Sequence, residues 1–219
     1  MRIRPITYRE LWMAEGALFV AILLQIAVEA IGPGLSFGPQ YLIIAAEIAL
    51  AVTLAISSPR RHIGQNGTLH RPIAITLLAI LSAANISSFI IVGRRLIMGS
   101  NHLSGRELLV SALAIFLTNI IVFALWYWEI DSPGLSGKKW SKNDKDFQFT
   151  QQDLGRDYAR WQPGFVDYLY LSVTNAINFA PADARPLTVQ AKALMGVQAL
   201  VSVFTLALVL ARSVSILGS

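Results

Sequence analysis

The chain has 219 residues, of which 54% are hydrophobic and only 14% are charged. Soluble domains normally carry about a quarter of their residues as charged side chains, so the composition excludes an ordinary soluble domain and indicates an integral membrane protein. The absence of cysteine excludes disulfides, thiolate metal sites and a cysteine nucleophile. The net charge of +5 comes from basic residues between the apolar runs. Lipid headgroups explain these residues better than nucleic acid does.

Five apolar stretches are long enough for transmembrane helices, because about 20 helical residues cross the hydrocarbon layer. They cover approximately 11–31, 40–57, 72–93, 107–128 and 189–213. The first stretch is expected to remain as a span, because Val28-Glu29-Ala30 is a poor signal-peptide cleavage site. No extended strand pattern is present. The predicted fold class is therefore all-α, a polytopic membrane protein with five transmembrane helices, of which the first four form a region covering 1–128.

A polar segment, 129–164, joins the fourth and fifth spans. It mixes lysines with aspartates, is near neutral and is too small to form a domain, so we expect it to lie at the membrane interface. The sequence Trp126-Tyr127-Trp128 stands at its entrance. Aromatic rings of this kind collect where apolar and hydrated layers meet, which predicts an interfacial aromatic belt.

A shorter apolar run, 165–179, precedes the last span. It has about fifteen residues, too few to cross the bilayer, and the chain becomes polar again by Asp183. This pattern predicts a re-entrant half-helix and loop, which together with the last span form a hairpin covering 165–219. Irregular backbone at membrane depth persists only beside other protein or water. The hairpin therefore implies an assembly or a cavity.

This hairpin resembles the pore region of two-transmembrane potassium channels, in which a pore helix runs into a Thr-Val-Gly-Tyr-Gly-Asp filter followed by Pro and Thr. The resemblance covers about the last fifty residues and implies a homotetramer with an ion pathway on its axis. The first four spans carry no channel signature. Without a gap, the matching positions are Tyr170, Ser172, Val173 and Ala176 around the pore helix, Asp183 in the filter, and Pro186 and Thr188 at the exit. Thr174 and Asn175 also fall on the pore helix.

The centre of the loop departs from the family, because Asn178-Phe179-Ala180-Pro181-Ala182 replaces Thr-Val-Gly-Tyr-Gly. A filter lined by carbonyl groups needs backbone conformations that glycine adopts freely, whereas proline fixes φ near −65°. Potassium selectivity by a carbonyl ladder is therefore not expected. Rings of Asn178 amides and Asp183 carboxylates are the better candidates for coordinating monovalent cations.

Glu47 is the main ionisable candidate outside the hairpin, since it lies well inside the second apolar stretch. A charge at that depth costs roughly 2.5 kcal/mol or more. One interpretation is that Glu47 takes part in ion or proton passage. The other is that Glu47 is simply protonated, or hydrogen-bonded to Asn85 or Asn119.

The distribution of Lys and Arg favours a cytoplasmic N-terminus in a cell membrane. With five spans, the hairpin would then enter from the cytoplasmic side, opposite to ordinary potassium channels and as in glutamate-receptor channels. Alternatively, the carboxylates of the polar segment 129–164 weaken the effect of its basic residues on the orientation, or the number of spans differs by one.

Two functions from different classes fit the sequence. The first is a potassium-channel-like, homotetrameric protein that passes monovalent cations with weak selectivity. The second is a transporter or non-conducting membrane scaffold that uses the hairpin for packing. An enzyme is not expected, because no nucleophile and base pair, metal cluster or phosphate loop is present, and no cofactor is predicted.

Overall fold

The computed structural model describes residues 8–31, 40–57, 70–98, 105–131, 145–154, 158, 161–180 and 183–217. Within these ranges the fold is helical, as predicted, with six α-helices, a 3-10 turn and a small antiparallel ladder. In chain order the elements are α1 (Tyr8–Ile31), α2 (Gln40–Ser57), α3 (His70–Met98), α4 (Gly105–Asp131), β1 (Phe147–Phe149), η2 (Thr150–Asp153), α5 (Phe165–Asn178), β2 (Ala184–Pro186) and α6 (Val189–Leu217).

Four of these helices are long and apolar enough to cross a membrane, so the first, third, fourth and fifth predicted spans are confirmed by length and composition. Within α2 the corresponding apolar stretch among the described residues is shorter, Ile43–Thr53. The four membrane-length segments are Arg9–Ile31 in α1, Pro72–Arg95 in α3, Arg106–Asp131 in α4 and Val189–Leu210 in α6.

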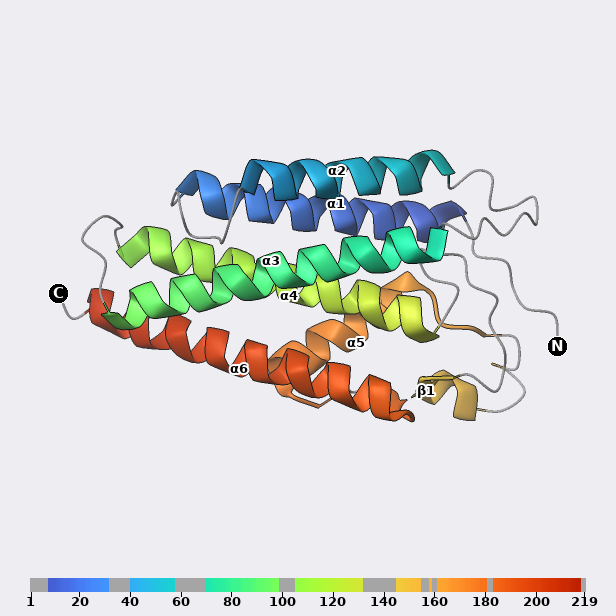
Figure 1. The fold of residues 1–219 in the computed structure, drawn as a ribbon. Coiled ribbons are helices and arrows are strands. Elements are labelled where there is room, and N and C mark those ends of the chain that lie inside the picture. Colours follow the sequence, from blue (N-terminus) through green and yellow to red (C-terminus); the bar gives the residue numbers. More distant parts are fainter. Residues whose placement is uncertain are drawn as a thin grey trace.

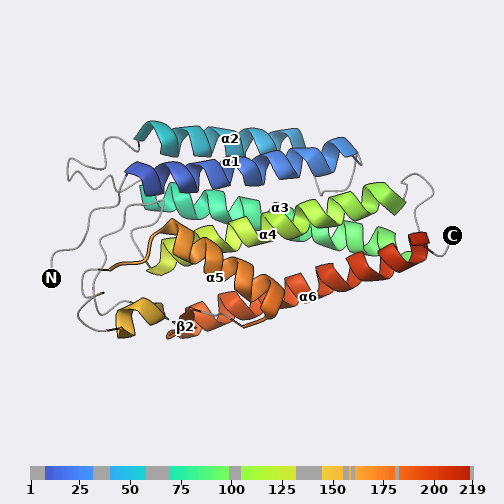
Figure 2. The same ribbon diagram turned by 180° about the vertical axis from the view of Figure 1, so that it is seen from behind.

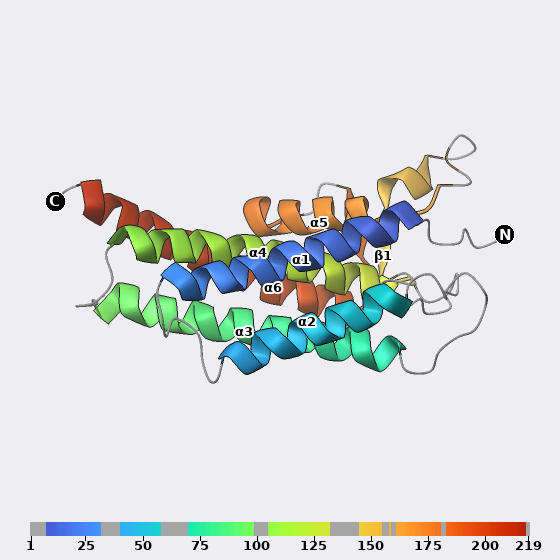
Figure 3. The same cartoon turned by 90° about the horizontal axis from the view of Figure 1, so that it is seen from above.

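The long helices run along a common direction (Figure 1). α1, α3 and α6 begin at one end of the bundle, where α2 and α4 end, and α5 also begins there and is much shorter than its neighbours (Figure 2). α4 is the central helix, because 67% of its membrane-length window is buried, against 33% for α1 and α3 and 22% for α6. Seen from above, α5 and α2 lie on opposite sides of α1 (Figure 3).

The aromatic residues at the end of α4 lie inside the protein, so the prediction of an interfacial belt is wrong for two of its three members. Tyr127 is fully buried and Trp128 is 2% exposed. They are covered because β1 and α5 fold over them: the Tyr127 ring lies 5.2 Å from that of Phe147, and the Trp128 ring lies 5.5 Å from that of Phe165. Hydrophobicity alone did not distinguish a surface facing lipid from one facing protein.

The ladder of β1 and β2 is a second difference from the sequence-based expectation, which contained no strand. Phe147 pairs with Pro186 and Phe149 with Ala184. Both phenylalanines are buried, whereas Gln148 between them is partly exposed. Three residues are too few for the alternation of a strand to stand out in a sequence. The ladder fastens the segment before α5 to the segment that precedes α6.

Candidate functional site

The candidate site is formed by α5 and the residues that return from its end to the start of α6. The sequence of α5 contains neither glycine nor proline and places its larger apolar groups three or four residues apart. This spacing produces one inward face. At the start of α5 the Asp167 carboxylate accepts a hydrogen bond of 2.7 Å from the Gly164 N–H, which satisfies a backbone donor before the first turn. The buried residues of α5 are Phe165, Tyr168, Leu171, Ser172, Thr174, Asn175 and Ala176.

A buried hydrogen-bonded cluster joins α5 to both neighbouring helices. The amide oxygen of Gln198 on α6 accepts from the Tyr127 hydroxyl at 2.6 Å and from the Asn175 side-chain nitrogen at 2.8 Å. The Gln198 nitrogen donates to the hydroxyl of Ser172 at 2.6 Å and to its carbonyl at 3.1 Å. Ser172 in turn donates to the carbonyl of Ile120 on α4 at 2.7 Å. Each of the four side chains, Tyr127, Ser172, Asn175 and Gln198, is hydrogen-bonded to another of the four inside one chain.

The end of α5 lies deep along α4. Ala176 packs against Phe116 and Ile120, and Leu206 of α6 borders the same group. Phe116 precedes the end of α4 at Asp131 by fifteen residues, which corresponds to roughly 22 Å of helix. The last turn of α5 is thus level with the middle of α4.

The opposite end of the site is fixed around Asp131, the last residue of α4. One carboxylate oxygen accepts the backbone N–H groups of Asp146 at 2.6 Å and Phe147 at 3.0 Å. The other accepts the Tyr168 hydroxyl at 2.6 Å. A single buried acid therefore holds the end of α4, the start of β1 and the second turn of α5 together.

The returning segment is tied to the same region. The Thr150 N–H donates to the Asp183 carbonyl at 2.9 Å, and the Leu187 N–H donates to the Asp146 carbonyl at 2.8 Å. The Thr188 hydroxyl donates to the Asp146 carboxylate and accepts from the Ala191 N–H, which makes Thr188 the N-cap of α6. Asp183 thus belongs to the anchored base of the loop.

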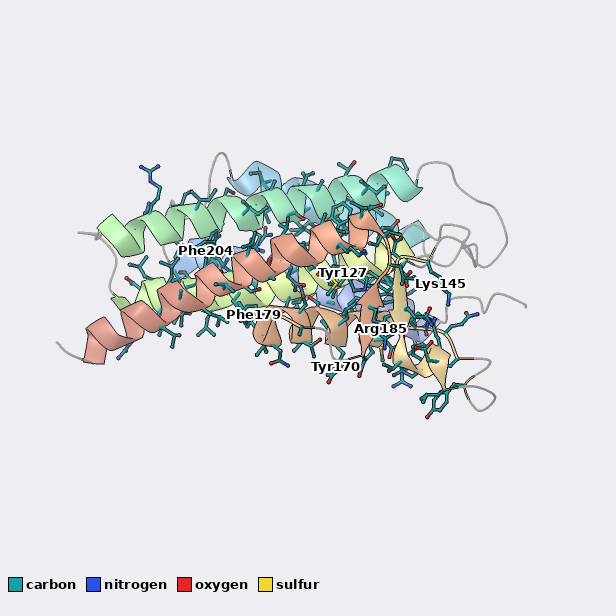
Figure 4. All side chains as sticks on the ribbon, turned by 90° about the horizontal axis from the view of Figure 1, so that it is seen from below. Tyr127, Lys145, Tyr170, Phe179, Arg185 and Phe204 are labelled. Carbon is teal, nitrogen blue, oxygen red and sulfur yellow. The ribbon has the colours of Figure 1, made fainter. Side chains whose placement is uncertain are left out.

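The tip of the loop differs from this base in its exposure. Asn178, Phe179 and Ala180 are exposed, and Phe179 has a left-handed backbone with φ of 56°. This conformation is common for glycine or asparagine at a helix C-terminus and costly for a bulky residue. Figure 4 shows Phe179 at the end of α5 remote from the ladder, with Arg185 and Lys145 at the ladder end. Two residues of the predicted ion pathway, Pro181 and Ala182, lie outside the described residues.

The predicted pore-helix residues divide between the two faces of α5. Ser172 and Asn175 belong to the buried cluster, and Thr174 bonds the carbonyls of Tyr170 and Leu171 within its own helix. Tyr170 is 48% exposed and lies on the outer side of α5 (Figure 4). Val166 and Ile177 on the same helix are also exposed. The outer face is thus apolar apart from the Tyr170 hydroxyl, while the inner face carries the hydrogen bonds.

Carboxylates gather where α5 begins. Burial raises the pKa of Asp167; the Gly164 hydrogen bond lowers it, and the neighbouring charges of Glu10 and Asp183 raise it. Among the described residues, no three His, Asp or Glu side chains are grouped so that they could hold a metal ion. The effect of this group is therefore electrostatic, a concentration of negative charge beside the start of α5.

Glu47 lies apart from the hairpin, on α2, and is fully buried. Its neighbour is Gln25 of α1. In one orientation the Gln25 amide donates to the Leu81 carbonyl at 3.3 Å, and in the other its nitrogen lies 3.2 Å from both Glu47 carboxylate oxygens. Asn119, expected as a partner of Glu47, instead donates to Ser202 on α6 at 3.2 Å.

Sequence reasoning missed two residues that organise the site, Gln198 and Asp131. Gln198 is the amide side chain within the uncharged part of the last span, 193–211, and that was the available signal. Asp131 was assigned to the interface because it follows the aromatic sequence, and its three hydrogen-bond donors come from segments that are distant in the sequence.

Comparison of the chain with protein families, with curated proteins and with solved structures gave no match. The functional assignment therefore rests on the residues of this chain.

Proposed function

We propose that the protein is a potassium-channel-like membrane protein in which α4, α5 and α6 act as outer helix, re-entrant pore helix and inner helix. In this arrangement α2 is a fifth span, since its 18 residues measure roughly 27 Å. The N-terminus is cytoplasmic, and α5 enters the membrane from that side.

The observation that carries the proposal is the exposed tip at the end of α5. With 14 residues, α5 is about 21 Å long, too short to cross a bilayer. Its last turn is level with the middle of α4, so the tip from Asn178 to Ala180 lies at membrane depth when α4 spans the bilayer. Irregular backbone cannot face lipid at that depth, because its N–H and C=O groups would lack partners. In the membrane, other copies of the chain or water must therefore cover the tip.

A ring of copies satisfies this requirement, since one hairpin per chain can line an axis only in a closed, symmetric oligomer. The resemblance to potassium channels supports four copies. α6 fits the inner position, because it is the least buried of the membrane-length helices. The left-handed Phe179 agrees with this arrangement, since strained backbone persists where the surroundings fix it.

In the proposed pore, Asn178 amides and Asp183 carboxylates attract and coordinate monovalent cations. Selectivity among these cations is weak because the loop lacks the filter glycines. The loop base is held to the segment before α5 by the Thr150 to Asp183 hydrogen bond. That bond uses the Asp183 main chain and leaves the carboxylate for the pore.

The alternative is a transporter or non-conducting scaffold. One observation favours it: the buried cluster of Ser172, Asn175, Gln198 and Tyr127 is completed within one chain, as a packing device would require. In that case the hairpin would stabilise a single chain, and removing the Asp183 carboxylate would change no current.

Planar-bilayer recording of the purified protein tests conduction. We expect a cation current that differs little between K⁺ and Na⁺ and falls severalfold in Asp183→Ala, because one carboxylate per subunit is lost from the pathway. Asp153→Ala is the matched control, since it removes an acid from η2, outside the loop, and should leave the current unchanged. Strong selectivity for K⁺ over Na⁺ would contradict the filter argument. The absence of any current would favour the scaffold.

A further inference from the structure

A cleft of about 280 Å³ lies between the start of α1 and the start of α5. The membrane-length segment of α1 begins at Arg9, so the cleft is level with the boundary between headgroups and hydrocarbon. It is close to the lower limit of about 300 Å³ for pockets that bind drug-sized molecules, which suits a small polar group. The residues that define its chemistry are Arg9, Glu10, Met13, Trp161, Phe165 and Asp167.

The polar residues of this cleft carry both signs of charge. Arg9 is exposed, whereas Glu10 and Asp167 are half-buried, and burial together with the nearby charge of Glu10 raises the pKa of Asp167. Glu10 lies against the start of α5, where a Cβ at Gly164 would approach the Glu10 Oε1 atom to 2.9 Å. The cleft therefore offers one cation and, farther inside, two carboxylates.

The remaining walls are apolar and lead toward the membrane interior. Met13, Trp161 and Phe165 line the cleft. Val166 also lines it and is 55% exposed, and Tyr170, which is 48% exposed, follows one turn farther along α5. A ligand with a charged head and an apolar tail matches this arrangement, in which a charged cleft is followed by an apolar surface.

We propose that the cleft binds the headgroup of a phosphoethanolamine lipid. The phosphate pairs with Arg9, the ammonium donates hydrogen bonds to Glu10 and Asp167, and an acyl chain lies along Val166 and Tyr170. An anionic lipid without an amine would place its phosphate on Arg9 but would offer no N–H donor to Glu10 and Asp167. A choline lipid carries the cation but has no N–H donor for the carboxylates. This proposal concerns a single chain and does not depend on conduction.

Native mass spectrometry of the full-length protein tests the assignment, using equal amounts of phosphatidylethanolamine, phosphatidylcholine and phosphatidylglycerol with identical acyl chains. We expect the ethanolamine lipid to be retained about tenfold over the choline lipid, the effect of losing one charge-assisted hydrogen bond. Glu10→Gln should abolish this preference. Arg9→Gln should lower retention of both lipids because both carry the phosphate. Arg185→Gln, an exposed arginine on β2, is the matched control and should change neither.

Equal retention of the three lipids, stronger retention of phosphatidylglycerol, or an unchanged preference in Glu10→Gln would each overturn the assignment. If Glu10→Gln does not fold, Asp167→Asn tests the same ammonium contact. Soluble glycerophosphoethanolamine should bind far more weakly than the lipid, and equal binding would exclude the acyl-chain contact. The same spectra report the mass of the assembly, so selective lipid retention by a monomer would support this site while contradicting the proposed channel.

Discussion

α2 packs on α1 and α3 chiefly through apolar side chains, whereas α4, α5 and α6 share a cluster of buried hydrogen bonds. Gln25 of α1, which reaches either Leu81 or Glu47, is a polar link of the first group. In the second group, Gln198 of α6 bonds residues of both other helices, Tyr127 on α4 and Ser172 and Asn175 on α5. Burial of apolar surface gives little drive for helix association inside a bilayer, so hydrogen bonds and close packing specify which geometry forms. The geometry of this protein is therefore specified most tightly around α5.

The largest expected effect comes from removing the centre of the cluster. Gln198→Leu leaves polar atoms of Ser172, Asn175 and Tyr127 buried without their partner, and we expect a loss of about 2–4 kcal/mol in the free energy of unfolding. Gln25→Leu is the matched control in the first group and should cost about 1 kcal/mol, because one hydrogen bond is lost. Unfolding equilibria in detergent measure both. Equal losses would remove the difference between the two groups of helices.

The second prediction compares two exposed phenylalanines, since Phe179 at the tip of α5 and Phe19 on α1 are both 48% exposed. The chain has no cysteine, so a single introduced cysteine has no competing thiol. Oxidation of Phe179→Cys in membranes should convert most of the protein to disulfide-linked dimers, because the tips meet near the axis. Phe19→Cys, on a helix expected to face lipid, should remain monomeric on denaturing gels. The reverse result would place the assembly interface on α1.

The smallest expected effect concerns Asp167, whose pKa in the folded protein lies above its ordinary value of 3.8. The fold favours the protonated form, so the stabilising contribution is fully present below that value and is lost as the pH rises through the raised pKa. Between about pH 4 and pH 7 the melting temperature of the wild type should therefore fall relative to that of Asp167→Asn, which keeps an acceptor for Gly164. Asp153→Asn on η2 should follow the wild type. A wild type that gains stability relative to Asp167→Asn over this range would contradict the raised pKa.

The helices were predictable where length and composition decide the outcome. The predicted run 165–179 agrees with α5 (Phe165–Asn178) to within one residue, because Pro163-Gly164 precedes it and polar residues follow it. α3 and α4 begin and end a few residues beyond the predicted apolar cores, since helices continue past the hydrocarbon layer.

The tertiary partners were not predictable in the same way. Tyr127 was assigned to an interface because aromatic side chains favour it, yet its hydroxyl bonds Gln198, 71 residues away. Asp131 is buried because backbone donors arrive from β1, an element too short to recognise in the sequence. Glu47 was expected deep within the second apolar stretch, and its side chain is buried in the structure. The proximity of Gln25 to Glu47 depends on how α1 and α2 pack, which composition does not determine.

Electron-microscopic imaging of the protein in lipid nanodiscs tests the central claim most directly, because it reports both the number of chains and the position of the hairpin. The proposal predicts a fourfold-symmetric particle in which the tips, from Asn178 to Ala180, and the Asp183 carboxylates at the loop bases surround the axis and α1 lies at the periphery. A monomer, or an oligomer in which these tips are packed away from every symmetry axis, would contradict it.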